Sequence, residues 1–409
     1  DTDFSAVLGK VAAADVDVLF LPDYYAKNNL IAAQVKEKGI DAILLGGDGW
    51  DSPELEFDLF EGGYHSNHYS PADPRPLVQN FVDAYSARYG ATPDALATLA
   101  YDAAKILMQS ISEAGVDDPS VVKDKMAGIS FEGVSGEITY DEFGNPVKKA
   151  AIVKIEGGKP TFFKFVAPGG AEEAPSAMVP AAPGFPVKLA IVVPLSGDVK
   201  TFGESTRDGA LMALDEAKAA GWDLEVVLAD SKCDAQEAAN AANKVIFEDE
   251  VKYNIGEVCS SASIPISEIA EPNQILQISP TSTNPAVTVN EDGSNKEYVF
   301  RACFLDPFQG EVVAALAVEL GASKAAVLFD VGNDYVKGLA EYFKSSFEAK
   351  GGEVPVYEAY TKDDTDFSAV LGKVAAADVD VLFLPDYYAK NNLIAAQVKE
   401  KGIDAILLG

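Results

Sequence analysis

The same segment stands at both ends of this chain, and this repeat constrains the fold more than any other feature. Residues 1–46 recur without one change as residues 364–409. Solenoid repeats have periods of about 20–50 residues and diverged copies, so a solenoid is excluded. The first copy continues into Gly47 and Asp48, whereas the second follows Lys362 and Asp363. Removing either copy leaves one continuous frame, so two identical segments compete for one place in the fold.

A second irregularity lies in the middle of the chain. Residues 167–185 are rich in Pro, Ala, Gly and Glu and lack periodicity, which indicates a flexible linker. A strand-like apolar run follows shortly after them. A central linker with a repeat at both ends is the pattern that circular permutation plus segment duplication would produce. We therefore interpret the chain as an engineered, recombinant permutant rather than a natural duplication, with its native start after the linker.

The charge balance excludes two classes of partner. Asp and Glu number 64 against 32 Lys and Arg, which gives a net charge of −32. Such a surface repels nucleic-acid phosphates and anionic lipid headgroups. No apolar run approaches the ~20 residues of a membrane span, and the chain opens without Met or a signal peptide. With 48% hydrophobic residues, we expect a soluble, globular protein with large cores.

Short apolar runs alternate with amphipathic helical stretches. The runs are apolar on consecutive residues, which is typical of strands covered on both faces in a parallel sheet. They span residues 189–193, 224–229, 325–329, 18–21 and 42–45. Helical spacing of apolar residues covers residues 4–11, 235–247 and 335–347. This alternation predicts a doubly wound α/β fold, in two lobes because there are too many units for one sheet.

Two hydroxyl-rich turns follow successive predicted strands. Cys259, Ser260 and Ser261 end one strand and open a helix, where free backbone N–H groups form an anion cradle. The next strand ends in residues 279–285, which read SPTSTNP. Serine N-capping and a plain loop are the alternative interpretations. Two such turns at successive strand ends favour a shared carboxylate site.

Acidic and aromatic residues follow three other predicted strands. Asp48 lies between glycines with Trp50 beside it, Asp23 and Tyr24 follow a second strand, and Tyr335 follows a third. An acid at such a place could pair with an ammonium group, although a turn-forming Asp is the simpler alternative. Aromatic side chains at loop tips favour a surface on which a ligand stacks.

Catalytic and metal-binding motifs are poorly represented. His65 and His68 are the only histidines, and an i, i+3 pair without a third ligand favours a loop or strand end over a metal site. The sequence has no GxSxG elbow, P-loop or GxGxxG motif. A hydrolase with Ser260 or Ser261 as nucleophile is an alternative, but no nearby base supports it. We expect no enzyme activity, no cofactor and no metal.

Three cysteines allow one disulfide with one cysteine left over. Cys233 and Cys259 both follow strands of the same predicted lobe. A bridge between them would close a loop of about 27 residues and stabilise the fold by about 3.5 kcal/mol in the chain-entropy model. It would imply an oxidising compartment. Cys303 would then be a buried thiol outside the bridge.

Several stretches, as a set, resemble one family. They read AIVVPLSGDVKTFGESTRDGALMAL, SKCDAQEAANAANKV, IGEVCSSASIPISEIAE, ISPTSTNPAVT, YVFRACFLDPFQG, LFLPDYY, LLGGDGW and GVSGEITYDEFGNPVK. Read from Val187 to Asp363 and then from Asp1 to Pro168, the chain resembles type I periplasmic binding proteins of the leucine/isoleucine/valine-binding kind. The resemblance covers everything except the linker and one copy of the repeat.

The resemblance implies two α/β lobes joined by a three-crossing hinge that closes on a ligand. Lobe I would comprise residues 186–305 and 73–133 and would grip the ligand's carboxylate. Lobe II would comprise residues 306–363, 1–72 and 134–166 and would grip its ammonium. The linker would join the native termini, and residues 364–409 would be an alternative occupant of lobe II.

The resemblance also assigns roles at the polar end of the ligand. Ser260, Thr281 and Thr283 would hold the α-carboxylate and part of the ammonium, and Asp48 would be the ammonium's counter-ion. Cys259 would lie at the same site, and its bridge would match the family's disulfide. Because one lobe would satisfy the anion and the other the cation, only a zwitterion would draw both together.

The rest of the implied site concerns the ligand's side chain. Tyr335 and Tyr24 would face the ligand across the cleft, and Phe202 and Leu96 would line its side-chain end. Trp50 adds bulk beside the implied ammonium site. An aliphatic, branched-chain amino acid is the default ligand.

The resemblance implies non-enzymatic amino-acid binding for ABC-type uptake, with a permease as the parent protein's partner. It places the parent in the periplasm, and residues 169–176 resemble the spacer of a bacterial lipoprotein. As an engineered permutant the chain would be a switch, a sensor or a domain-swapped homo-oligomer; a scaffold with a vestigial pocket is the alternative. We expect the ligand to favour the first copy of the repeat, because that copy keeps the Asp48 loop continuous.

Overall fold

The computed structural model of the protein describes residues 8, 12, 18–21, 25–46, 55–148, 150–166, 180–197, 199–319, 321–361, 363–386, 388–403 and 405–408. It divides into two compact units. Unit 1 contains Asp1–Asn67, Ile152–Thr161 and Asp306–Gly409, and unit 2 contains His68–Ala151 and Phe162–Leu305. None of the described helices combines the length and the apolar character that a membrane crossing requires.

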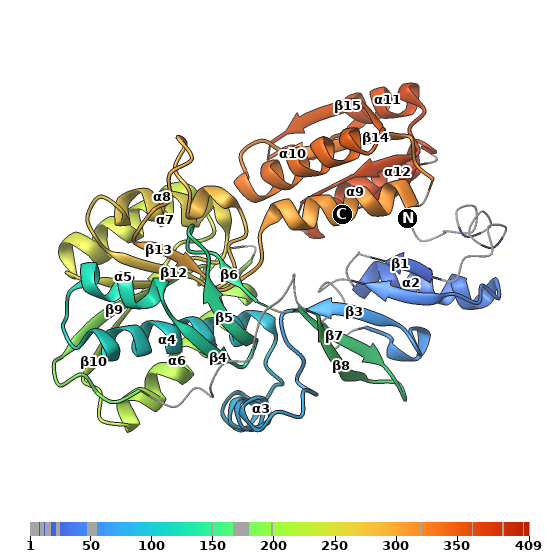
Figure 1. The fold of residues 1–409 in the computed structure, drawn as a ribbon. Coiled ribbons are helices and arrows are strands. Elements are labelled where there is room, and N and C mark those ends of the chain that lie inside the picture. The colour runs from blue at the N-terminus through green and yellow to red at the C-terminus, as the bar shows by residue number, and fades with distance from the viewer. Residues whose placement is uncertain are drawn as a thin grey trace. The chain divides into compact units, whose positions relative to one another are not determined.

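Unit 2 is built on a parallel sheet of five strands in the order β10-β9-β11-β12-β13. Its strands are β9 (Val187–Val193), β10 (Leu224–Asp230), β11 (Tyr253–Gly256), β12 (Leu276–Ser279) and β13 (Val299–Arg301). Its helices are α3 (Pro76–Tyr89), α4 (Ala95–Ala114), α5 (Pro119–Ala127), α6 (Lys200–Ala219), α7 (Ala235–Asn243) and α8 (Ser260–Ala270) (Figure 1). Consecutive residues of β9 and β11 are buried, as expected for strands covered on both faces.

Unit 2 also carries a small antiparallel sheet, β4-β5-β6. Its strands are β4 (Ser130–Gly133), β5 (Gly136–Tyr140) and β6 (Pro146–Val147). We expected residues 68–72, 134–151 and 162–166 in lobe II, but they lie in unit 2. For the longest of these segments, the β4–β5 pairing explains the difference. The reason is local, because β5 pairs with β4 through a tight turn and β4 directly follows α5.

Two further sheets lie wholly or mostly in unit 1, and strands β7 and β8 of the second continue into unit 2. The first is parallel, in the order β15-β14-β16-β17, and the second has the order β1-β2-β3-β7-β8. The strands are β1 (Val18–Leu21), β2 (Ile43–Gly46), β3 (Tyr64–Asn67), β7 (Ala150–Ile155), β8 (Pro160–Val166), β14 (Lys324–Asp330), β15 (Glu353–Tyr360), β16 (Val381–Phe383) and β17 (Ile406–Leu408). The helices are α2 (Tyr25–Glu37), α9 (Asp306–Glu319), α10 (Asp334–Ala349), α11 (Ser368–Ala377) and α12 (Tyr388–Glu400) (Figure 1).

The described residues of both copies of the repeat include strands, and the strands of each copy lie in a different sheet. In the second copy β16 pairs with β14, whereas in the first copy β2 pairs with β3. Leu19 and its duplicate Leu382 are both buried, in separate hydrophobic clusters. Among the described strands, β1 and β17 each lie at one end of their sheets.

The predicted elements agree with the observed ones in type, with one difference. Strands occupy all five predicted apolar runs, and α10 covers the predicted helix at 335–347. The predicted helix at 235–247 ends earlier as an α-helix, because α7 stops at Asn243 and a π-helical turn covers Lys244–Glu248. The helix predicted at 4–11 lies almost entirely outside the described residues, and its duplicate lies in α11.

Candidate functional site

The N-terminus of α8 presents backbone donors in a ring of hydroxyl groups. Cys259 is the N-cap residue, and its carbonyl accepts hydrogen bonds from the N–H groups of Ala262 and Ser263 at 3.1 and 2.8 Å. Within the described part of the chain, the N–H groups of Ser260 and Ser261 have no acceptor. The two donors and the helix dipole favour an anion at this place.

The second hydroxyl-rich turn is fastened to the first. The Thr281 hydroxyl donates to the Val258 carbonyl at 3.2 Å, and the Asn284 N–H donates to Ser260 Oγ at 3.1 Å. Ser260 is 2% exposed, and its hydroxyl is the acceptor in this contact. Thr283 lies in the same turn and is half-buried. The structure therefore brings the three predicted carboxylate-binding residues to one sheet edge.

Arg301 anchors the second hydroxyl-rich turn. It lies at the end of β13 and is fully buried. Its guanidinium donates to the carbonyls of Ser282 and Asn284 at 2.7 and 2.9 Å and to the Thr288 hydroxyl at 3.1 Å. A buried guanidinium with several carbonyl acceptors fixes a loop more firmly than backbone turns alone.

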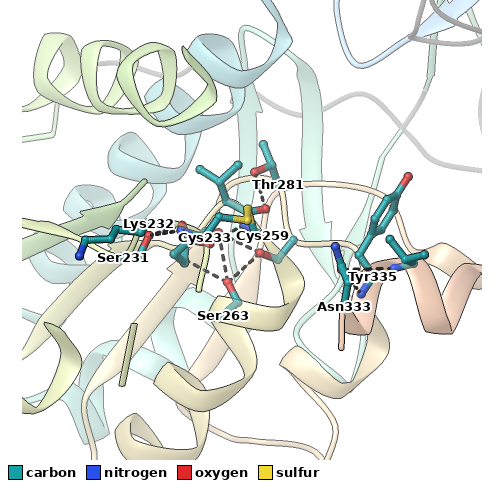
Figure 2. The surroundings of a disulfide bond; sticks show 12 residues. Ser231, Lys232, Cys233, Cys259, Ser263, Thr281, Asn333 and Tyr335 are labelled. Carbon is teal, nitrogen blue, oxygen red and sulfur yellow. Dashed lines mark hydrogen bonds between the residues drawn. A yellow bond between two sulfur atoms is a disulfide. The ribbon is translucent and has the colours of Figure 1, made fainter. Parts of the chain in front are cut away.

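The predicted disulfide is present. Cys233 and Cys259 are bridged, with their Cα atoms 5.6 Å apart, and the bridge joins the segments after β10 and β11 (Figure 2). Cys303 is buried outside the bridge, as predicted, and its thiol donates to the Ser282 carbonyl at 3.3 Å. The bridge pins the N-cap of α8 to the neighbouring strand end.

Replacing both bridged cysteines by alanine is expected to lower the free energy of unfolding by about 3 kcal/mol, because the unfolded chain gains loop freedom. Urea unfolding followed by circular dichroism measures this loss. The unmodified protein in dithiothreitol should lose a similar amount, and Cys303→Ala should respond to the reductant as the unmodified protein does. Equal stability with and without the bridge would contradict the role that we give it.

The residues predicted at the ligand's side-chain end lie in the same unit as the turns. Phe202 on α6 and Leu96 on α4 are half-buried and pack against the core of unit 2. A hydrogen bond joins the two helices near their N-termini, because the Ser205 hydroxyl of α6 donates to the Asp94 carboxylate that caps α4. The position of the two side chains relative to a ligand stays a prediction.

The residues predicted on the other lobe are described only in part. Tyr335 is the second residue of α10 in unit 1, and its N–H donates to the capping Asn333 side chain at 3.1 Å (Figure 2). Tyr24, Asp48 and Trp50 lie outside the described residues. The ammonium-binding half of the predicted site therefore stays a prediction.

The structure describes Asp386, which is the duplicate of Asp23 in the second copy of the repeat. That carboxylate is 8% exposed and accepts a hydrogen bond from the Tyr360 hydroxyl at the end of β15. The fold itself thus supplies the partner of this acid. Asp23 itself lies outside the described residues.

The two histidines, His65 and His68, lie in or next to the strand β3. His65 lies in β3, and His68 stacks on Phe304 with ring centroids 4.5 Å apart. Burial lowers the pKa of His68 to about 3, so its ring is neutral at ordinary pH. The described residues contain no group of three or more His, Cys, Asp or Glu side chains that could hold a metal ion.

Sequence reasoning missed Glu257. This residue directly follows β11, just before the predicted anion cradle, and is fully buried. Its carboxylate accepts hydrogen bonds from the Ser231 hydroxyl and the Cys259 N–H. The available signal was an acid between an apolar strand and a serine-rich helix start, but its burial depends on contacts with residues more than twenty positions away.

Comparison with known proteins places the chain in a family. The family model described as periplasmic binding protein matches residues 1–159 and 186–409. The leucine-, isoleucine-, valine-, threonine- and alanine-binding protein of Pseudomonas aeruginosa is 33% identical over 227 residues, which is 54% of this chain and 60% of the relative. The Leu/Ile/Val-binding protein homolog 3 of Brucella melitensis is 33% identical over 229 residues, with the same coverage of 54% and 60%.

A solved structure agrees with this placement. The leucine-binding protein of Thermotoga maritima is 36% identical, with a TM-score of 0.50 over 54% of this chain and 62% of that one. This chain therefore spans about 60% of the length of the curated relatives that it matches. The parallel sheets and the likeness confirm the predicted α/β binding-protein fold. Because the family match extends over almost all of the sequence, the chain belongs to the periplasmic binding protein family.

Proposed function

We propose that this protein binds one free aliphatic amino acid, and that its parent serves ABC-type amino-acid uptake together with a permease. The observation that carries the proposal is the α8 N-terminus, where two N–H groups without an acceptor among the described residues lie beside the hydroxyl of Ser260. Such a cradle suits a carboxylate. The names of the relatives from Pseudomonas and Brucella point to leucine, isoleucine and valine as first candidates.

Ser260, Thr281 and Thr283 would hold the ligand's carboxylate, and Asp48 would pair with its ammonium. Hydroxyl and backbone donors match an anion, and a carboxylate matches a cation. Tyr335 and Tyr24, with Trp50, would contact the ligand from the second lobe, and Phe202 and Leu96 would line its side-chain end. Closure of the two lobes would then require both charges on one molecule, which selects zwitterions.

We further propose that the chain is an engineered circular permutant with a duplicated segment. The family match is interrupted at residues 160–185, where the composition indicates a linker, and it includes both copies of the repeat. The ligand would favour the first copy, because only that copy continues without a break into Asp48. The other copy would be displaced or would pair with a second molecule, which gives domain-swapped oligomers.

Calorimetric titration with the twenty amino acids tests the binding function. Leucine, isoleucine or valine is expected to give saturable heat with one site. Ser260→Ala is expected to weaken that binding about tenfold, because a hydrogen bond to a charged group is lost. Ser294→Ala, at an exposed loop serine, is the matched control and should bind as the unmodified protein does. If none of the twenty amino acids gives heat, the proposed function is wrong.

A further inference from the structure

The backbone and the side chain of Glu257 connect all the segments that form the anion cradle. Its carbonyl accepts hydrogen bonds from three serine hydroxyls, those of Ser263 on α8, Ser279 at the end of β12 and Ser282 in the following turn, at 3.1, 2.7 and 2.9 Å. Its side chain reaches the segment after β10, where the Ser231 hydroxyl donates to Oε1 at 2.6 Å. Three strand ends therefore meet at this one residue.

The Glu257 carboxyl group lies next to the donors that the ligand would use. Oε2 accepts the Cys259 N–H, and the next N–H, that of Ser260, has no acceptor within the part of the chain that the structure describes. The group is 0% exposed, so a charge on it would be little screened by water. A negative charge here and a ligand carboxylate at Ser260 would repel each other while sharing one helix N-terminus.

We infer that Glu257 is a positioning residue whose charge opposes the ligand's carboxylate, so that amino-acid binding weakens in alkaline solution. The inference rests on the proposed function, because it presumes a carboxylate at the α8 N-terminus. The neutral acid can donate its proton to Ser231 Oγ and keeps the cradle in place without a competing charge. The ionised acid keeps the same contacts but adds the repulsion.

The surroundings of Glu257 support a change in the charge of its carboxyl group near neutral pH. Burial raises its pKa to about 8, and the negative charge of Asp230 adds to the rise, while the hydrogen bonds from Ser231, Cys259 and Val258 oppose it. From the elements packed against it, α8 and β12 contribute hydroxyls. Lys232, on the β10 side, is exposed and pairs with Glu237 at 2.9 Å.

The test is a titration with leucine at pH 7 and pH 9.5, for the unmodified full chain and for Glu257→Gln. The ratio of the two dissociation constants, unmodified over variant, is expected to rise about tenfold between these pH values, which corresponds to one unit of pKa coupling. The leucine ammonium titrates equally in both proteins, so the ratio cancels it. Glu271→Gln, at the opposite end of α8, is the control and should follow the unmodified protein.

A second readout does not depend on the variant. Leucine binding should raise the pKa of Glu257 further, so the unmodified protein should take up protons on binding near pH 8. Titration in two buffers with different ionisation enthalpies measures this uptake. A flat ratio, or binding without proton uptake, would overturn the role of Glu257 and leave the proposed function standing. Absence of leucine binding at pH 7 in both proteins would instead overturn both.

Stability gives a third readout without ligand. A carboxyl group whose pKa rises from 4.5 in the unfolded chain to about 8 in the folded one favours folding fully below pH 4.5. This stabilisation decreases as the pH rises from 4.5 to about 8. Above that pH, the ionisation of Glu257 no longer changes the free energy of unfolding. Glu257→Gln should therefore show a smaller fall in unfolding midpoint between pH 5 and pH 8 than the unmodified protein. An equal fall in both proteins would contradict the burial of a titrating acid.

Discussion

Leu19→Asp is expected to weaken amino-acid binding about a hundredfold, whereas the same change in the second copy, Leu382→Asp, is expected to leave binding intact or to tighten it. Both leucines are buried, at 5% and 0% exposure, in central positions of β1 and β16. Burying an unpaired carboxylate there costs several kcal/mol of stability, so the copy that carries it is displaced from its sheet. Only the first copy leads without a break into Asp48, which would bind the ammonium.

The observed registers indicate what the remaining copy does. Val381 of β16 pairs with Ala325 of β14, and Leu45 of β2 pairs with Tyr64 of β3. Because the copies are identical, one copy can make both ladders and join the two sheets of unit 1 in the order β15-β14-β1-β2-β3-β7-β8. The Leu382→Asp protein should adopt this single sheet with the first copy.

Calorimetry on the two variants, at equal concentration and with leucine, gives the comparison. Size-exclusion chromatography over a range of concentrations should show fewer oligomers for both variants than for the unmodified chain, because one exchangeable segment is removed. Equal dissociation constants for Leu19→Asp and Leu382→Asp would show that the copies are equivalent and that the continuity of the Asp48 loop is irrelevant.

Asp102→Ala is expected to lower the free energy of unfolding by about 3–5 kcal/mol, because the buried groups that pair with this carboxylate would lose their charged partner. Asp102 lies on α4 with 0% exposure and accepts the N–H groups of Val134 and Ser135, both at 2.8 Å. A Cβ atom on Gly133 would lie 2.5 Å from Asp102 Oδ2, so the turn after β4 is shaped around this carboxylate. Lys148, also buried, donates to the Ser135 hydroxyl at 2.7 Å.

The control is Glu113→Ala at an exposed acid near the end of the same helix, which should leave the unfolding midpoint unchanged. Urea unfolding followed by circular dichroism at pH 7 measures both variants. Burial lowers the pKa of Lys148 to about 8, and the Asp102 charge opposes that fall. The Asp102→Ala protein should therefore also release the Lys148 proton at a lower pH. A loss of less than 1 kcal/mol would contradict the burial that the structure gives to this carboxylate.

The elements of the fold could be predicted from local pattern, but their assembly could not. Consecutive apolar residues at 189–193 and 325–329 indicate buried parallel strands, and both occur. The placement of residues 134–151 depends on the β4–β5 pairing, which the apolar pattern does not determine. The two copies of the repeat have equal sequences and thus equal propensities, so only their neighbours decide that one pairs with β14 and the other with β3.

The candidate site, too, could be predicted from the sequence only in part. The serine-rich helix start and the Cys233–Cys259 bridge could be predicted, because small hydroxyl residues directly follow an apolar run and because both cysteines follow strands of the same predicted lobe. Arg301 and Glu257 could not, because charged residues are buried only where distant segments supply their partners. Both now explain why the two hydroxyl-rich turns stay together.

The central claim is that one small zwitterion is held by its two opposite charges. Titration of the unmodified chain with leucine, leucinamide and 4-methylpentanoate tests it most directly, since the three compounds share a side chain and differ only in the charges near it. We predict saturable binding of leucine and binding at least about a hundredfold weaker for each analogue, because each lacks one charged partner. Equal affinity for leucine and 4-methylpentanoate, or no binding of leucine, would contradict the claim.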